Sequence, residues 1–354
     1  MSTNEKVWFI TGTSRGFGRE WAEAALERGD KVAATARDTG SLQPLTDRYG
    51  DLVLLPLELD VTNKPAVDSA VARAHEHFGG LDVVVNNAGY GLFGTVEEIS
   101  ETEARAQIET NLFGALWVTK AALPIFRAQG SGHFLQVSSI GGVMAFANLS
   151  MYHVSKWGLE AFSQSLAQEM EPFGVHVTVV EPTNYGTDWS GSSAVHATPI
   201  DVYEPARAAR AARIKPGMVG DPAATRGPIL EIVDSERPPL RFLLGRGQVD
   251  RIAAEYEQRM KSGAPGRSSP SRPMATRGSN RRTSVATSAA LLMAAPAPPG
   301  FSRGVFRSVG RWCQSAGGVG QQVVSGTADA LDEVLPGAGE PLFHLERGAA
   351  EFGR

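Results

Sequence analysis

Three side chains that could do acid–base chemistry stand near one another in the middle of the chain: Ser139, Tyr152 and Lys156. Tyr152 and Lys156 are four residues apart, so on a helix they share one face. A free tyrosine has a pKa of about 10 and is a poor catalyst at neutral pH, but an ammonium about 4 Å away is worth roughly 4 kcal/mol, or about three pKa units. We therefore expect Tyr152 to titrate near neutral pH. An isolated Tyr-x-x-x-Lys is also what an ordinary amphipathic helix gives, with a core tyrosine and a surface lysine.

A second candidate site is the segment Thr-Gly-Thr-Ser-Arg-Gly-Phe-Gly at 11–18. It follows the apolar run 7–10, which is typical of a buried parallel strand, and leads into helical spacing over 17–28. Glycines there let the backbone approach a pyrophosphate, whose charge meets the N–H groups and dipole of the new helix. The spacing differs from Gly-x-Gly-x-x-Gly, so a structural turn without a ligand is the alternative.

The expected strand 31–36 ends where nucleotide-binding folds distinguish their cofactors. An acidic side chain there would bind the free ribose 2′-OH of NAD, whereas this chain has Ala36 and Arg37. Arg15 supplies a second guanidinium suited to a 2′-phosphate. Each charge-assisted hydrogen bond is worth roughly 1.5–3 kcal/mol, so the pair predicts a preference for NADP of about a hundredfold or more. The alternative is that both arginines are solvated surface residues.

The rest of the first 261 residues alternates between buried strands and amphipathic helices. Strands are expected at 52–55, 83–85, 134–137 and 240–244, and helices at 65–78, 152–170 and 249–260. Small and polar residues follow two of the strands, Asp60-Val61 after the third and Asn86 to Gly89 after the fourth. Such residues can line a cofactor crevice or simply form turns. The alternation predicts an α/β fold.

Taken together and in order, these motifs resemble the short-chain dehydrogenase/reductase family, in its single-domain branch, over about residues 6–261. The branch is the one loosely called 17β-hydroxysteroid-dehydrogenase-like. The motifs that carry the resemblance are the glycine turn, Asp60-Val61, Asn86-Asn87-Ala88-Gly89, Asn111, Ser139 and Tyr152-x-x-x-Lys156. The resemblance implies a Rossmann-type, doubly wound, seven-stranded parallel sheet with helices on both faces.

By this resemblance, Tyr152 exchanges a proton with a substrate oxygen that Ser139 holds and polarises. Lys156 binds the nicotinamide ribose and lowers the pKa of Tyr152, and Asn111 anchors a water in the proton relay. The expected cofactor-binding residues are Gly12, Ser14, Arg15, Gly16, Phe17, Gly18, Arg37, Asp60, Val61, Asn87, Ala88, Gly89, Tyr152, Lys156 and Thr187. The implied activity is hydride transfer between NADP(H) and the carbonyl or secondary alcohol of a small, apolar substrate. A cofactor-sensing regulator with the same fold, or an inactive relic with an altered C-terminus, is the alternative.

The chain departs from the family pattern after the sixth strand, where Pro182 is followed by Thr183 rather than glycine. A side chain at Thr183 could crowd the nicotinamide. The segment 188–216 matches the family's mobile lid and predicts an apolar pocket that closes over the substrate. Its arginines could meet an anionic substrate or form a solvated helix face; they are Arg207, Arg210 and Arg213.

Composition favours a cytoplasmic enzyme. Of the 354 residues 42% are hydrophobic, and the net charge of −4 argues against nucleic acid as a partner. We expect no signal peptide and no membrane span. Cys313 is the single cysteine and allows no intrachain disulfide, which fits a reducing cytosol. The seven histidines form no ligand-like cluster, so no metal site is expected, and the expected partners are a small substrate and further copies in a homodimer or homotetramer.

The character of the sequence changes after residue 261. We expect the cofactor-binding domain to span 1–261 and a disordered tail to span 262–354, because a segment rich in Pro, Gly, Ser, Ala and Arg cannot bury enough apolar surface to offset its ordering entropy. Two other readings stay open. Residues 305–335 could form a small interaction module, or the tail could be translated sequence that selection never shaped, such as a frameshift product.

Overall fold

The computed structural model describes residues 5–212, 219–245 and 247–263. The chain divides into two compact units, Met1–Ala264 and Pro265–Arg354. The second unit lies outside the described residues, as does Arg213, so the hypotheses for the tail, including the module at 305–335, stay predictions.

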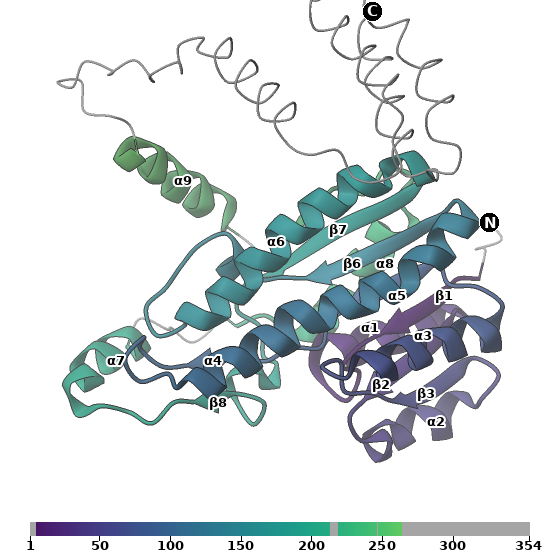
Figure 1. Cartoon of the computed structure of the whole chain (residues 1–354), viewed down its shortest axis with the longest axis horizontal. Coiled ribbons are helices and arrows are strands. Elements are labelled where there is room, and N and C mark those ends of the chain that lie inside the picture. The colour runs from purple at the N-terminus through teal and green to yellow at the C-terminus, as the bar shows by residue number, and fades with distance from the viewer. Residues whose placement is uncertain (1–4, 213–218, 246, 264–354) are drawn as a thin grey trace, which may run out of the picture. The chain divides into compact units, whose positions relative to one another are not determined.

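Seven parallel strands form the central sheet in the order β3-β2-β1-β4-β6-β7-β9 (Figure 1). The strands are β1 (Val7–Ile10), β2 (Lys31–Ala36), β3 (Leu54–Glu58), β4 (Val83–Asn86), β6 (Gly132–Val137), β7 (Val175–Pro182) and β9 (Arg241–Leu244). The order reverses between β1 and β4, and at such a point the carboxyl ends of the strands open a crevice. The predicted doubly wound fold is confirmed.

Helices cover both faces of the sheet. The helices α1 (Gly16–Arg28), α2 (Gln43–Tyr49) and α8 (Arg226–Asp234) pack on one face, and α3 (Lys64–Phe78), α5 (Gly114–Gln129) and α6 (Ser150–Met170) on the other. Neighbouring residues of β1 serve the two cores: Trp8 packs with Trp21 of α1, and Phe9 packs with Phe126 of α5. Burial on both faces explains why the strands read as continuous apolar runs.

The remaining elements surround the carboxyl ends of the strands or cap the helices. They are α4 (Glu101–Ile108), α7 (Glu204–Ala211), α9 (Val249–Gly263), the π-helical turn η2 (Glu109–Phe113), the short 3₁₀ turns η1 (Thr39–Leu42), η3 (Ile140–Gly142), η4 (Glu171–Phe173), η5 (Asp188–Ser190), η6 (Asp201–Tyr203) and η7 (Pro222–Thr225), and a two-stranded sheet of β5 (Leu92–Phe93) and β8 (Val195–His196). Within the described ranges, no helix combines the length and apolar character needed to cross a bilayer.

The predicted strand at 52–55 is wrong by two to three residues, because β3 runs from Leu54 to Glu58. Leu52 is 87% exposed and belongs to the preceding turn. The strand continues through Pro56, which has no N–H to donate. β3 lies at the edge of the sheet, where a proline is tolerated because one side of the strand has no partner.

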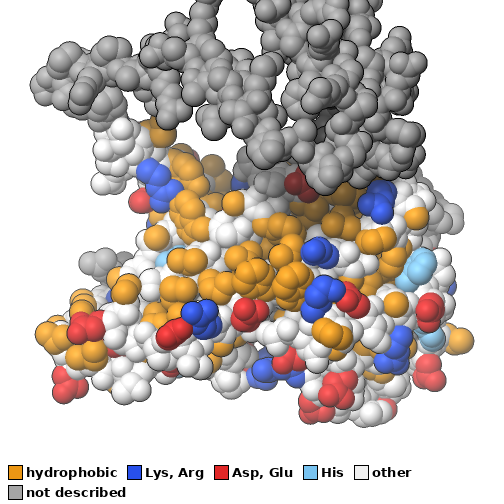
Figure 2. Space-filling view, viewed as in Figure 1, with side chains coloured by type: hydrophobic (Ala, Val, Ile, Leu, Met, Phe, Trp, Pro, Cys, Tyr) orange, Lys and Arg blue, Asp and Glu red, His pale blue; other side chains and the backbone are white. Residues whose placement is uncertain are grey.

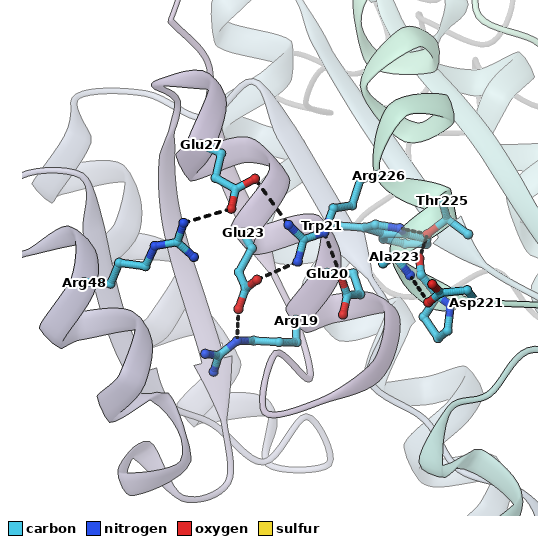
Figure 3. A network of polar contacts seen from close by, with 11 residues as sticks. Arg19, Glu20, Trp21, Glu23, Glu27, Arg48, Asp221, Ala223, Thr225 and Arg226 are labelled. Atoms are coloured by element: carbon cyan, nitrogen blue, oxygen red, sulfur yellow. Dashed lines mark hydrogen bonds and ion pairs between the residues drawn. The ribbon is translucent and has the colours of Figure 1, made fainter.

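The chain returns from the lid segment onto α1 through a polar network (Figure 3). Arg226, at the start of α8, pairs with Glu20, Glu23 and Glu27 on one face of α1. The indole N–H of Trp21 donates to the hydroxyl of Thr225 over 2.8 Å in a buried bond. These contacts fix α1, whose first turn forms part of the crevice described below.

Candidate active site

A cleft of about 680 Å³ opens at the carboxyl ends of the strands, and the sequence-predicted residues gather around it. The predicted residues that line it are Gly12, Ser14, Arg15, Gly16, Phe17, Arg37, Asp60, Val61, Asn87, Ala88, Gly89, Ser139, Tyr152, Lys156 and Thr187. Gly18 and Asn111 are the predicted residues that do not line the cleft. The structure thus brings the candidate nucleotide and acid–base residues to one site, while their roles stay predictions.

The glycine turn is fixed by hydrogen bonds from the residue that follows β4. The side-chain amide of Asn87 donates to the carbonyl oxygens of Thr11 and Gly12 over 2.9 and 3.0 Å. Gly12 has a φ of +70°, and a Cβ there would lie 3.0 Å from the Cα of Ala88. A Cβ at Gly18 would overlap both the Gly12 carbonyl oxygen and the Asn87 amide. The turn therefore requires glycine at position 18, because the Gly12 carbonyl and the Asn87 side chain leave no room for a Cβ there.

Thr11 is a supporting residue that the sequence reading did not assign a role. Its hydroxyl donates to the carbonyl of Val85 over 3.1 Å and accepts from the backbone N–H groups of Asn87 and Ala88 over 2.9 and 3.0 Å. Its position directly after an apolar strand and before the first glycine was the available signal. The hydroxyl ties the ends of β1 and β4 together at the point where the cleft opens.

The end of β2 presents a cationic side chain to the cleft. Arg37 is exposed, and no partner is recorded for it among the described residues. The neighbouring Asp38 accepts from the backbone N–H of Gly40 through Oδ1 over 2.9 Å and caps the turn that follows. Asp60 accepts from the N–H and hydroxyl of Thr62 over 2.9 and 2.8 Å.

Arg15 already has a partner in the lid. Its Nη1 lies 2.7 Å from Asp188 Oδ2 and also donates to the hydroxyl of Ser192 over 2.7 Å. The side chains of Arg15 and Asp188 are each 49% exposed, so water screens the pair. An anion that enters the turn would compete with Asp188 for this guanidinium, which links the glycine turn to the lid.

Tyr152 and Lys156 are buried side by side on α6, with Ser139 beyond the end of β6. The ammonium of Lys156 donates to the carbonyl of Val137 over 2.7 Å and lies 5.9 Å from the centre of the Tyr152 ring. The Ser139 hydroxyl accepts from the N–H of Gly141 over 3.0 Å. All three side chains line the cleft.

The predicted lowering of the Tyr152 pKa toward neutrality is wrong for this structure. Burial raises the pKa of Tyr152 to about 12, and a hydrogen bond with Ser139 opposes this only in part. Burial also lowers the pKa of Lys156 to about 8, against the charge of Glu160, which raises it. The ammonium of Lys156 donates to the Val137 carbonyl rather than to the phenol. Tyr152 therefore holds its proton at neutral pH.

Asn111 stands behind the site rather than in the cleft. It lies in the π-helical turn between α4 and α5, and such turns recur at functional sites. Its side-chain amide donates to the Tyr90 carbonyl over 3.0 Å and to the Ser155 hydroxyl over 3.2 Å, and its oxygen accepts from the Tyr90 N–H over 3.1 Å. The side chain anchors the loop that follows β4 against α6.

An aromatic cluster lies beside Tyr152. Trp189 of the lid lies with its ring centre 4.9 Å from that of Tyr152 and 5.1 Å from that of Phe93. Phe93 in turn stacks on His196 at 5.0 Å. The small sheet of β5 and β8 holds this arrangement, which the sequence did not reveal, because two-residue strands leave no periodic signal.

The two lid arginines that the structure describes, Arg207 and Arg210, make specific contacts and do not form a solvated face. Arg207 pairs with Glu98 and Glu204. Arg210 donates to the carbonyl of Ala147 over 2.8 Å and lies over the ring of Phe146. Neither side chain lines the cleft, so an anionic substrate has no support from them.

Thr183, the departure from the family pattern, packs its side chain over the backbone of Gly245 and also lines the cleft. Whether it crowds a bound nicotinamide stays a prediction. No cluster of metal-ligating side chains occurs in the part of the chain that the structure describes.

The known proteins that this chain resembles are oxidoreductases and short-chain dehydrogenases. A family model described as short chain dehydrogenase matches residues 6–196. The chain is 44% identical over 248 residues to the oxidoreductase BOA17 of Botryotinia fuckeliana, covering 69% of this chain and 90% of that protein.

Two crystal structures are similar. A short-chain dehydrogenase from Streptomyces avermitilis is 36% identical with a TM-score of 0.67, covering 73% of this chain and 95% of that one. A short-chain dehydrogenase/reductase from Burkholderia phymatum, solved in complex with NAD, is 22% identical with a TM-score of 0.66. The match covers 76% of this chain and 99% of that one, and it concerns the fold alone. With the matched family model, the relatives and the geometry of the cleft, the chain belongs to the short-chain dehydrogenase family and is an oxidoreductase.

Proposed function

We propose that the protein is an NADP-dependent carbonyl reductase in which Tyr152 is the proton donor. The observation that carries the proposal is that Ser139, Tyr152 and Lys156 line the same cleft as the glycine turn. One ligand could then contact both groups of residues.

The residues at the glycine turn fit a nicotinamide dinucleotide. The positive φ angles of Gly12 and Gly16, +70° and +58°, and the tight space around Gly18 bring bare backbone to the start of α1. Backbone N–H groups and the helix dipole there suit a pyrophosphate. We expect Lys156 and Tyr152 to contact the nicotinamide ribose, and Thr187, which lies across from Gly16, to contact the carboxamide.

Preference for NADP over NAD rests on the end of β2. Arg37 is exposed and lines the cleft, Ala36 stands where an acid would bind a ribose hydroxyl, and Asp38 caps the turn that follows and does not line the cleft. A guanidinium binds a 2′-phosphate with two parallel hydrogen bonds. Arg15 would add a second donor once it exchanges Asp188 for the phosphate.

The chemistry follows from the states of the three side chains. The bound nicotinamide supplies or accepts the hydride. Tyr152, protonated at neutral pH because burial raises its pKa to about 12, donates its proton to the carbonyl oxygen of the substrate as that oxygen gains negative charge. The Ser139 hydroxyl donates a hydrogen bond to the same oxygen and stabilises the charge. A protonated phenol is the state that carbonyl reduction requires.

The substrate end of the cleft favours an apolar carbonyl compound. Trp189 and Val195 line it beside Tyr152, and Phe93 packs behind Trp189. Apolar and aromatic walls with a few converging polar groups are typical of sites for small apolar ligands.

The first test is oxidation of NADPH with a panel of apolar ketones and aldehydes. Tyr152→Phe should abolish turnover of any substrate that the parent accepts, by orders of magnitude, and leave NADPH affinity within about threefold. Substantial activity in the variant would show that another group donates the proton.

The second test concerns the cofactor. NADPH should bind at least about tenfold tighter than NADH, and the double variant Ala36→Asp with Arg37→Ala should reverse the order, because it replaces a phosphate donor by a ribose acceptor. Equal affinity of the parent for both cofactors would refute the assignment of Arg37.

A cofactor-sensing regulator is the second candidate. It would bind NADPH in the same cleft but would need no buried proton donor. Binding of NADPH without turnover across the whole carbonyl panel would favour this candidate, or an inactive relic, over the reductase.

We also propose that the enzyme works in the cytoplasm as a homodimer or homotetramer. Figure 2 shows an apolar area on the face that carries α5 and α6. Partly buried apolar side chains there include Trp117, Ala121, Ile125 and Phe162. Light scattering of the parent and of Trp117→Glu tests the assembly: a monomeric parent would refute it.

A further inference from the structure

Helix α6 carries a third buried polar side chain in line with the two of the active site. Tyr152, Lys156 and Glu160 are spaced by four residues, so they form one column on the helix face. All three are 5–6% exposed. Glu160 does not line the cleft and has no part in the chemistry proposed above.

The carboxylate of Glu160 is clamped from the sheet side by Arg241 of β9. Arg241 Nε lies 3.3 Å from Glu160 Oε2 and 3.6 Å from Glu181 Oε1 of β7, so one guanidinium reaches both acids. Its Nη2 donates to the side-chain oxygen of Gln164 over 2.9 Å, one helical turn beyond Glu160. The two carboxylate side chains are buried, 8% and 5% exposed, whereas the side chain of Arg241 is 40% exposed and closes the pair off from the solvent side.

The loop that follows the catalytic serine is shaped to admit this carboxylate. A Cβ at Gly142 would lie 3.0 Å from Glu160 Oε1 and would overlap the hydroxyl of Ser138. Glycine is therefore required at 142 because a side chain would displace the acid from the end of β6.

Three charged groups meet on the sheet side of α6: Glu160 on the same helix as Lys156, Glu181 on β7 and Arg241 on β9. Burial lowers the pKa of Lys156, and the charge of Glu160 raises it. Burial raises the pKa of Glu160, while Ser138, Arg241 and Lys156 oppose this. Burial and the charge of Glu160 raise the pKa of Glu181 to about 7, so Glu181 is the acid of the pair that takes up a proton near neutral pH.

Within the proposed reductase function, we propose that Glu160 is a positioning residue: its carboxylate, clamped by Arg241, holds Lys156 as an ammonium ion beside Tyr152. Without that counter-charge, a lysine buried to this degree loses its proton more readily. The ammonium is what stabilises negative charge on the phenol oxygen when Tyr152 gives up its proton.

The test is a pH titration of the protein alone, labelled with ¹³C at the lysine ε-carbon and followed by NMR, with the Lys156 signal assigned from Lys156→Met. Glu160→Gln should lower the Lys156 midpoint by about one to two pH units, and Glu160→Asp, which keeps the charge, should stay near the parent. The matched control is Glu169→Gln, which removes an exposed carboxylate from the same helix and should leave the midpoint unchanged. Glu160→Met offers a second neutral replacement if Glu160→Gln does not fold.

Glu181 provides a second prediction of the same experiment. The charge of Glu160 raises the pKa of Glu181, so in Glu160→Gln the Glu181 carboxyl should ionise more readily and supply part of the lost negative charge. The double variant Glu160→Gln with Glu181→Gln should therefore lower the Lys156 midpoint further than Glu160→Gln alone. An unchanged Lys156 midpoint in the neutral Glu160 variants and in the double variant, or an equal fall in Glu169→Gln, overturns the proposal.

The titration needs neither substrate nor cofactor, so its result is independent of whether the parent reduces any carbonyl. If the parent is active, the alkaline limb of its pH–rate profile should move to lower pH in Glu160→Gln by the same amount as the Lys156 midpoint. A parent without turnover on the carbonyl panel refutes the reductase function and leaves the titration to decide the role of Glu160.

Discussion

Replacing Arg226 by methionine should destabilise the folded domain by about 1–3 kcal/mol near neutral pH. The guanidinium pairs with three carboxylates of α1, Glu20 at 2.7 Å, Glu23 at 2.6 Å and Glu27 at 3.2 Å. Arg226 is 28% exposed and the glutamates are 24%, 18% and 41% exposed, so solvent screens the pairs only in part. A fully exposed pair is worth roughly 0.2–1 kcal/mol, and here the substitution also leaves three like charges on one helix face.

The loss should depend on pH in a defined direction. Burial raises the pKa of Glu23, but hydrogen bonds from Arg19 and Arg226 and their charges outweigh it, and the pKa lies below its ordinary value. A carboxyl with a lowered pKa in the folded state stabilises the fold above its unfolded pKa, and this contribution is lost as pH falls through the folded pKa. The difference between parent and variant should be full near about pH 7 and shrink toward about pH 3, below the ordinary pKa of a glutamate.

Thermal and urea unfolding at both pH values measure the effect, with an expected fall in Tm of roughly 2–10 °C at the higher pH. The matched control is Arg105→Met, which breaks an exposed pair with Glu101 on α4, 75% and 79% exposed, and should cause no measurable loss. NADPH affinity should stay at the parental value because Arg226 does not line the cleft. Equal losses in the two variants, or a loss of the same size at both pH values, would refute the reasoning.

Three further outcomes are expected. Asp188→Asn frees Arg15 for the 2′-phosphate and should tighten NADPH binding by about three- to tenfold in calorimetry while leaving NADH unchanged; parallel changes for both cofactors would contradict this. Trp189→Ala removes the ring that lies against Tyr152 and should raise the KM for apolar carbonyls by about tenfold or more, with a smaller change in kcat; an unchanged KM would exclude Trp189 from substrate contact. Ending the chain at Ala264 should leave Tm and activity at parental values, since the whole seven-stranded sheet lies within Met1–Ala264, and a loss of either would assign a structural role to residues 265–354.

The central strands were predictable because burial on both faces turns each into a continuous apolar run. β2 spans Lys31–Ala36 as predicted, and β1 spans Val7–Ile10. The edge strand β3 was placed two to three residues too early because Leu52 continues the apolar pattern although its side chain is 87% exposed. At this edge of the sheet, the apolar sequence pattern starts earlier than the buried strand does.

The sequence predicted which residues would line the candidate site, but it did not predict how deeply they are buried or which groups they contact. Gly12, Ser139 and Tyr152 line one cleft because the carboxyl ends of parallel strands meet at one edge of the sheet. The environment of Tyr152 depended on burial and on the direction of the Lys156 ammonium, and spacing along a helix specifies neither. The aromatic contact between Phe93 and Trp189 joins segments almost a hundred residues apart, without a local pattern to indicate it.

The sequence by itself determined the family, the parallel sheet and the identity of the residues at the cleft, because these depend on local periodicity and on motifs of fixed spacing. Tertiary structure alone decided the partners of the charged groups: Arg15 with Asp188, and Glu160 with Arg241. Charge interactions depend on distance and on exclusion of water, and both are set only when α6, the lid and the last strand of the sheet come together.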